Sequence, residues 1–205
     1  MGSNSRRLTM GSYGEFGKGS IIYYSSINSD IVTPYSTTAF GDARIIHNIY
    51  NNGIGEIKFD RELTTIGNNA FRDCSGLTSV VIPDSVISIG DEAFYNCNKL
   101  TGLTFGSGVT SIGSYAFIYC DGLTSLTLGS GVTSIGTGAF SRCSGLISIT
   151  CKSPIAPSIY SYTFYQVKNG GILYYPLGSD YSKWLSTASY YLGYYNWIGA
   201  PIQTN

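Results

Sequence analysis

Five cysteines are the residues of this sequence whose type and spacing could most readily support chemistry. Four of them recur every 23 residues and a fifth follows at a shorter interval: Cys74, Cys97, Cys120, Cys143 and Cys151. A zinc site needs close pairs of the CxxC kind, which this sequence lacks. A disulfide needs side chains that face one another, and cysteines at equal positions of a repeat point the same way. The favoured interpretation is a column of small buried thiols, with a disulfide or metal column as the alternative.

The other groups that could take part in catalysis form no known motif. His47 is the only histidine, and no serine, cysteine or acid is tied to it by a recognisable pattern. The pair Asp91–Glu92 lies where a short helix is expected to begin, a place that favours carboxylates. The Gly-Ser-Gly turns at 106–108 and 129–131 lack the lysine and long helix of a phosphate-binding loop. We therefore predict no catalytic residue, no metal site, no cofactor and no enzymatic activity.

A 23-residue unit, repeated four times without gaps, positions these cysteines. Every copy has isoleucine at position 13, glycine at 14, alanine at 17, phenylalanine at 18 and cysteine at 21; the copies are residues 54–76, 77–99, 100–122 and 123–145. A fixed period of this length is the signature of a stacked solenoid. Apolar positions 4 and 6 flank a mostly polar position 5, which is typical of a strand with one buried face. Positions 13, 17 and 21 fall on one side of a short helix.

Stacking of the copies would bury both apolar faces at once. We expect the strands to lie side by side in parallel at about 4.8 Å, with helix beside helix and identical side chains in columns through the core. The glycine at position 14 needs either a left-handed backbone or a close approach of neighbouring chains. The favoured interpretation is the left-handed backbone, at the turn into the helix.

The resulting pattern, LxxLxLxxxVxxIGxxAFxxC, resembles the bacterial leucine-rich repeats of the BspA-like surface-antigen class over residues 54–145. The resemblance implies a solenoid on an exported or cell-surface protein concerned with adhesion or recognition, and it implies no chemistry. We predict an α/β solenoid, a right-handed leucine-rich-repeat stack with a parallel sheet of short strands on one face and short helices on the other. Capping segments are expected at both ends, because a solenoid would otherwise expose apolar ends and strand edges.

The expected organisation has four parts: a disordered or tag-like segment 1–19, an N-terminal cap 20–53, leucine-rich repeats 54–151 with a partial fifth copy, and a C-terminal cap 152–205. In the N-terminal cap, a hairpin is predicted about Asn52–Gly53. In the C-terminal cap, a last strand is predicted at 170–176 and a helix at 179–195, with Ser179 or Asp180 as its N-cap.

The charge balance and the apolar runs restrict the partners. The chain has 12 basic and 12 acidic residues, and charged residues make up 12% of it, about half the usual share. This argues against nucleic acid and against anionic membranes as partners. No apolar run reaches the roughly 18–20 residues of a membrane span, so direct membrane insertion is not expected. The first residues lack the apolar core of a signal peptide, so either the protein is intracellular or an export signal is missing upstream. The resemblance to the surface-antigen class favours the second, and we expect the protein to be cell-surface or secreted.

Two exposed faces are the candidate ligand-binding surfaces. The strand face is expected to present one residue from each copy: Lys58, Val81, Thr104, Thr127 and Thr150. The helix side is expected to present a tyrosine patch made of Tyr95, Tyr115 and Tyr119. Aromatic patches are enriched at recognition sites, although a cluster without function is the alternative.

From these features we predict a non-enzymatic extracellular recognition or adhesion module. Its partner would be a protein or glycan on a host or neighbouring cell surface, bound through the repeat surface. The alternative is a structural spacer or stalk of a larger surface protein without its own ligand. A third interpretation, a carbohydrate-active enzyme, needs paired carboxylates across a cleft, and the repeats show none at matched positions.

Overall fold

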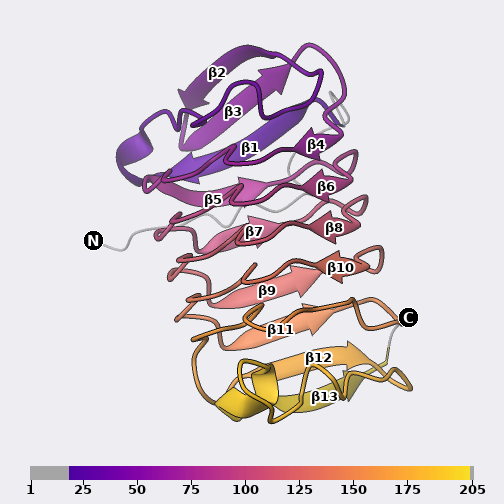
Figure 1. The fold of residues 1–205 in the computed structure, drawn as a ribbon. Helices are drawn as coiled ribbons and strands as arrows, with labels where there is room; N and C mark the ends of the chain where they lie inside the picture. Colours follow the sequence, from indigo (N-terminus) through magenta and orange to yellow (C-terminus); the bar gives the residue numbers. More distant parts are fainter. Residues whose placement is uncertain (1–18, 204–205) are drawn as a thin grey trace.

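The computed structural model describes residues 19–203, which form a stack of coils with strands on two sides (Figure 1). The longer strands are β1 (Ile21–Ser26), β2 (Ile45–Asn51), β3 (Ile54–Phe59), β5 (Leu77–Val81), β7 (Gly102–Thr104), β9 (Ser125–Leu128), β11 (Ser148–Cys151), β12 (Ile172–Pro176) and β13 (Ile198–Ile202). The two-residue strands are β4 (Thr65–Ile66), β6 (Ser88–Ile89), β8 (Ser111–Ile112) and β10 (Ser134–Ile135). The prediction for residues 1–19 lies, apart from Gly19, outside the described residues.

The parallel stacking predicted from the repeat is present on both sides of the coils. The short strands form one parallel sheet, β4–β6–β8–β10, in which equal positions of the repeat are paired, such as Ile89 with Ile112. On the other side β5 pairs with β7, and β9, β11, β12 and β13 pair in parallel. Neighbouring copies are therefore in register at steps of one repeat, and the chain forms a β-solenoid.

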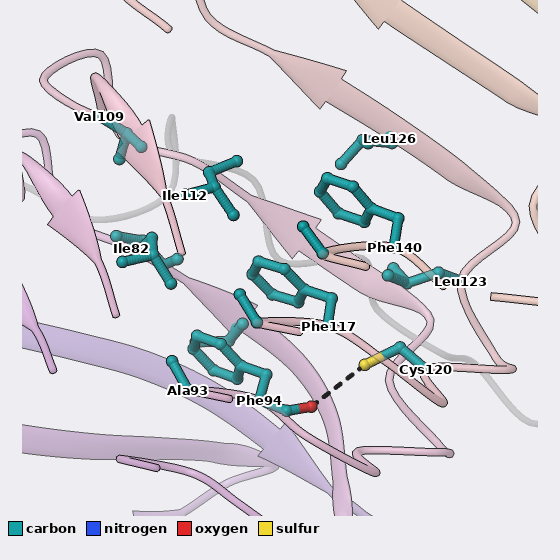
Figure 2. Packing of buried hydrophobic residues seen from close by; sticks show 14 of the residues in the cluster. Ile82, Ala93, Phe94, Val109, Ile112, Phe117, Cys120, Leu123, Leu126 and Phe140 are labelled. Carbon is teal, nitrogen blue, oxygen red and sulfur yellow. Dashed lines mark hydrogen bonds between the residues drawn. The ribbon is translucent and has the colours of Figure 1, made fainter. Parts of the chain in front are cut away.

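A column of phenylalanine rings fills the centre of the stack, as the repeat predicts (Figure 2). The ring centroids of Phe94 and Phe117 are 5.0 Å apart and those of Phe117 and Phe140 are 5.3 Å apart, with interplanar angles of 6° and 4°. Phe164 comes one residue late in the partial fifth copy, yet its ring stacks on Phe140 at 6.0 Å. The extra residue is therefore absorbed in the loop before it, and the column continues into the C-terminal cap.

The predicted short helices are wrong, because residues 19–203 contain no α-helix. Positions 16 and 20 of each copy have a left-handed backbone: Asn69 and Asp73, Glu92 and Asn96, Tyr115 and Tyr119, and Gly138 and Arg142. A right-handed helix cannot continue through such residues. The amides of Asn69, Phe71 and Asp73 instead donate to carbonyl oxygens of the next coil at 3.0, 2.7 and 2.8 Å. Each segment is thus a pair of turns that is hydrogen-bonded between coils.

The C-terminal cap differs from its prediction in the same way. β12 occupies the predicted last strand, but residues 179–195 form turns and a single 3₁₀ helix, η3 (Leu192–Tyr195). The Leu192 amide donates to the Trp184 carbonyl oxygen at 3.0 Å, so the chain folds back on itself instead of running as a helix. The Trp184 indole donates to the Pro157 carbonyl oxygen at 3.0 Å and closes the core. A further strand, β13, was not predicted. No described helix is long and apolar enough to cross a membrane.

The repeated glycine at position 14 is explained by the close approach of coils, and the favoured left-handed interpretation is wrong. None of the four has a left-handed φ. A Cβ at Gly90, Gly113 or Gly136 would lie within 2.5–2.6 Å of atoms in the preceding coil. The second interpretation given above is therefore the correct one.

The N-terminal cap inserts a strand into the stack. The hairpin predicted about Asn52–Gly53 is formed by β2 and β3, and both turn residues have a positive φ, 51° and 85°, as a type I′ turn requires. Strand β1 lies between β3 and β5 and is antiparallel to both. The first and second copies are consequently bridged by β1 and are not paired directly on this side.

A second interruption lies between the third and fourth copies. Strands β7 and β9 belong to different sheets, whereas β8 and β10 of the same copies are paired. Leu103 and Phe105 beside the gap are only partly buried, while Leu126 and Leu128 at the same positions of the next copy are buried. We call this gap between β7 and β9 the seam.

Candidate binding surface

The strand-face residues do not form one continuous row. Lys58 lies on β3 between β1 and β2, and the seam separates Thr104 from Thr127. Thr127 and Thr150 are paired neighbours on β9 and β11. Val81 is only 5% exposed, because β1 and β7 flank it with Tyr23 and Thr104, so the expectation that it is exposed is wrong. Ligand binding by the other four stays a prediction.

Two of the three predicted tyrosines lie together. The ring centroids of Tyr95 and Tyr119 are 5.7 Å apart, and the rings meet edge to face at 70°. Tyr115 belongs to position 16 and not to position 19 or 20, and its ring covers Gly138 of the next coil. Tyr115 is 41% exposed and is not part of the ring pair.

Two arginines that the sequence analysis missed extend this pair along the stack. The guanidinium carbon of Arg72 lies 4.0 Å from the centre of the Tyr95 ring. The guanidinium carbon of Arg142 lies 5.2 Å from the Tyr119 ring centre and 6.0 Å from that of Tyr165. We call these five residues the Arg–Tyr ridge. The sequence does contain a pattern that indicates the ridge. Position 19 is arginine in the first copy and tyrosine in the second, and position 20 is tyrosine in the third copy and arginine in the fourth.

Further tyrosines of the C-terminal cap continue the ridge. Tyr190 stacks on Tyr162 with ring centroids 4.3 Å apart and meets the edge of Tyr165 at 5.2 Å. Tyr194 packs edge to face on Tyr195 at 5.0 Å. An almost unbroken line of rings and guanidinium groups thus runs from the first copy to the last coil.

The two arginines of the ridge differ in charge compensation. Arg72 forms ion pairs with Glu92 and with Asp73, the latter at 3.4 Å. Arg142 has no ion pair and no side-chain hydrogen bond within residues 19–203. An arginine held on a tyrosine face with free N–H donors can bind planar polar groups of a ligand. Arg142 is therefore the more available of the two.

A hollow of about 570 Å³ opens beside Arg142. Its lining includes Tyr119, Asp121, Arg142, Gln166, Asn169 and Tyr195. The Tyr195 hydroxyl accepts a hydrogen bond from the Gln166 amide at 2.9 Å, and an Asp121 oxygen accepts one from the Ser144 hydroxyl at 2.8 Å. Burial raises the pKa of Tyr195, so this hydroxyl is neutral. No sequence pattern indicates this hollow, because its residues come from the third copy, the fourth copy and the C-terminal cap.

The cysteine column is structural. The thiols of Cys97, Cys120 and Cys143 are buried and donate to phenylalanine carbonyl oxygens of the preceding coil at 3.1, 3.3 and 3.2 Å; Figure 2 shows the bond from Cys120 to Phe94. The favoured interpretation of buried thiols is confirmed for Cys97, Cys120, Cys143 and Cys151, whereas Cys74 is only partly buried. Burial raises the pKa values of all five thiols, so they are protonated almost completely at neutral pH. Within residues 19–203, no cluster of histidine, cysteine and acidic side chains could hold a metal ion.

Thiol alkylation should report this burial. Burial raises the pKa of the half-buried Cys74 to about 11, so about one thiol in a thousand is ionised at pH 8. We expect iodoacetamide to label native Cys74 slowly, with a rate that rises about tenfold per pH unit up to about pH 11. Cys97, Cys120 and Cys143 should stay unlabelled until denaturant is added. Peptide mass spectrometry would measure this, and equal labelling of Cys120 and Cys74 in the native protein would contradict the buried column.

His47, the remaining candidate from the sequence, lies in the N-terminal cap. Its Nε2 atom is 2.8 Å from an oxygen of Glu56 on the neighbouring strand β3. The pair joins two strands of the hairpin, and it lies away from the Arg–Tyr ridge, whose residues belong to the turns. This geometry is that of a cross-strand contact.

A family model described as "BspA type Leucine rich repeat region" matches residues 46–170 in six copies. Among solved structures, a leucine-rich repeat protein of T. pallidum is 25% identical with a TM-score of 0.48; the match covers 56% of this chain and 53% of that one, so this chain spans about half of it. A leucine-rich repeat protein of Bacteroides capillosus is 25% identical with a TM-score of 0.41, over 65% of this chain and 94% of that one. A leucine rich cell surface protein of Faecalibacterium prausnitzii is 21% identical with a TM-score of 0.36, over 72% and 55%. The comparison with curated proteins found no match.

Proposed function

This chain belongs to the BspA-type leucine-rich repeat family, and from this premise we propose that it is a non-enzymatic recognition module at the cell surface or in secreted form. Its partner is a protein or glycan on a host or neighbouring cell surface. The observation that carries the proposal is the Arg–Tyr ridge, which places rings and guanidinium groups of successive coils in one line. Tyrosine and arginine are the residue types that most often dominate binding energy at interfaces.

The chemistry of the described residues supports binding over catalysis. Four of the five cysteines are buried and Cys74 is half-buried, and His47 is engaged with Glu56. Asp121 and Arg142 are the charged residues that line the hollow, and their opposite charges balance. Paired carboxylates across a cleft, which glycoside hydrolysis requires, are not among the residues that line it.

Substitution on the ridge tests the proposal. The wild-type protein is screened against arrays of glycans and extracellular-matrix proteins, and the strongest partner is then titrated against variants. We expect Tyr119→Ala to weaken binding about 30-fold, the effect of losing a ring that dominates an interface. Tyr115→Ala, a tyrosine of the same coil outside the ridge, is the matched control and should change binding less than about threefold.

The outcomes separate the recognition module from its alternative. A folded protein that binds nothing on either array would favour the structural spacer. Equal losses in Tyr119→Ala and Tyr115→Ala would place binding elsewhere than on the ridge. The proposed location is tested separately, by antibody labelling of intact cells that produce the protein; label found only after lysis would contradict it.

A further inference from the structure

We propose that the hollow beside Arg142 is a binding site for a neutral pyranose sugar, at the end or branch of a glycan. The inference rests on the proposed function and specifies one of its ligands. Its volume of about 570 Å³ falls within the roughly 300–1,000 Å³ of small-molecule sites. Three observations point to a sugar: the aromatic ring surface, the free planar polar groups and the cancelled charge of the lining.

The aromatic part of the lining suits the apolar face of a sugar ring. Tyr119 and Tyr195 both line the hollow. Each ring packs against a second tyrosine, Tyr119 against Tyr95 at 5.7 Å and Tyr195 against Tyr194 at 5.0 Å. The C–H groups on one face of a pyranose carry partial positive charge and pack on the negative face of such rings.

The polar part of the lining suits vicinal hydroxyl groups. The guanidinium of Arg142 and the side-chain amides of Gln166 and Asn169 have no side-chain hydrogen bond within residues 19–203. Each group is planar and offers two polar atoms side by side, which can meet two adjacent hydroxyls. One Asp121 oxygen is fixed by Ser144 at 2.8 Å, which leaves the other oxygen as an acceptor.

The charge of the lining selects among sugars. Asp121 and Arg142 are the charged residues that line the hollow, and their charges cancel. The nearby Tyr195 hydroxyl stays neutral, because burial raises its pKa. A sulfate, phosphate or second carboxylate would meet Asp121 without a second cation to balance it, so a neutral hexose or N-acetylhexosamine fits better.

Titration of the whole chain with methyl glycosides of neutral hexoses and N-acetylhexosamines, followed by NMR or calorimetry, tests the inference. We expect binding by at least one of them, weakened about tenfold or more in Arg142→Gln and in Asn169→Ala, the usual effect of losing such hydrogen bonds. Arg61→Gln is the matched control: it removes an exposed arginine of the first copy, outside both the ridge and the hollow, and should change binding less than about threefold. Circular dichroism confirms that each variant is folded.

Three results would overturn the inference. These are the absence of binding by every neutral glycoside at about 10 mM, binding confined to sulfated or sialylated sugars, and equal losses in Arg142→Gln and Arg61→Gln. If the array partners of the preceding section still depend on Tyr119 while the glycosides fail, the recognition module stands and only the sugar site falls.

Discussion

Replacing Phe117 by alanine is expected to lower the free energy of unfolding by about 3–5 kcal/mol. Phe117 is fully buried, with 0% of its surface exposed. Its ring stacks on Phe94 and Phe140 at 5.0 and 5.3 Å and meets the edge of Phe105 at 5.7 Å. Coils held in register by backbone hydrogen bonds can collapse little into the cavity, so the full cost usual for a buried phenylalanine is expected.

Urea unfolding followed by circular dichroism measures this loss. Tyr115→Ala is the control, because it also removes an aromatic ring from the third copy, but from an exposed position. The control should lower the free energy of unfolding by less than about 1 kcal/mol. If Phe117→Ala costs no more than the control, the phenylalanine column does not form the core.

Alanine at Gly106 and alanine at Gly129 are expected to have opposite effects, although both glycines occupy position 7 of their copies. A Cβ at Gly106 would lie 2.2 Å from the Pro83 carbonyl oxygen, so backbone must shift, at a cost of about 1–3 kcal/mol. A Cβ at Gly129 would meet nothing within 4 Å. At Gly129 alanine causes no clash and only lowers the conformational entropy of the unfolded chain. The free energy of unfolding should therefore stay the same or rise by up to about 1 kcal/mol.

The two variants can be compared by the same urea experiment and by thermal unfolding. The difference in stability between the two variants tests whether the seam is present. Gly106 packs closely against the preceding coil, whereas Gly129 lies at the seam and has no atom of another coil close to it. Equal destabilisation by the two substitutions would mean that the third and fourth copies are in close contact on the side of β7 and β9.

The period of the repeat was sufficient to predict the stacking, and the ambiguity of its spacing led to the error on helices. Ile112, Ala116 and Cys120 are all buried, as a helical stripe would be. A pair of turns with left-handed residues four apart buries the same three positions. Asn69 and Asp73 are tolerant of a left-handed backbone, but Tyr115 and Tyr119 are not typical of it, and so the sequence pattern of the later copies did not indicate these turns.

The candidate site was predictable only where it follows the repeat. Tyr95 and Tyr119 belong to adjacent copies at neighbouring positions, so their contact could be expected. The hollow is lined by Asp121 and Arg142 together with Asn169 and Tyr195. The repeat ends before residue 167, so the positions of the last two residues could not be predicted from its period. The strand β1 between β3 and β5 is unpredictable for a similar reason, since its partner depends on the cap and not on the repeat.

The seam has a mechanical consequence. Across it the backbone of one sheet is discontinuous, while β8 and β10, together with the turns bonded between coils, still join the third copy to the fourth. Fewer backbone hydrogen bonds therefore join the third copy to the fourth than join the second copy to the third. Tension along the stack is expected to separate the coils first between Thr104 and Ser125, where no strand pairing holds them.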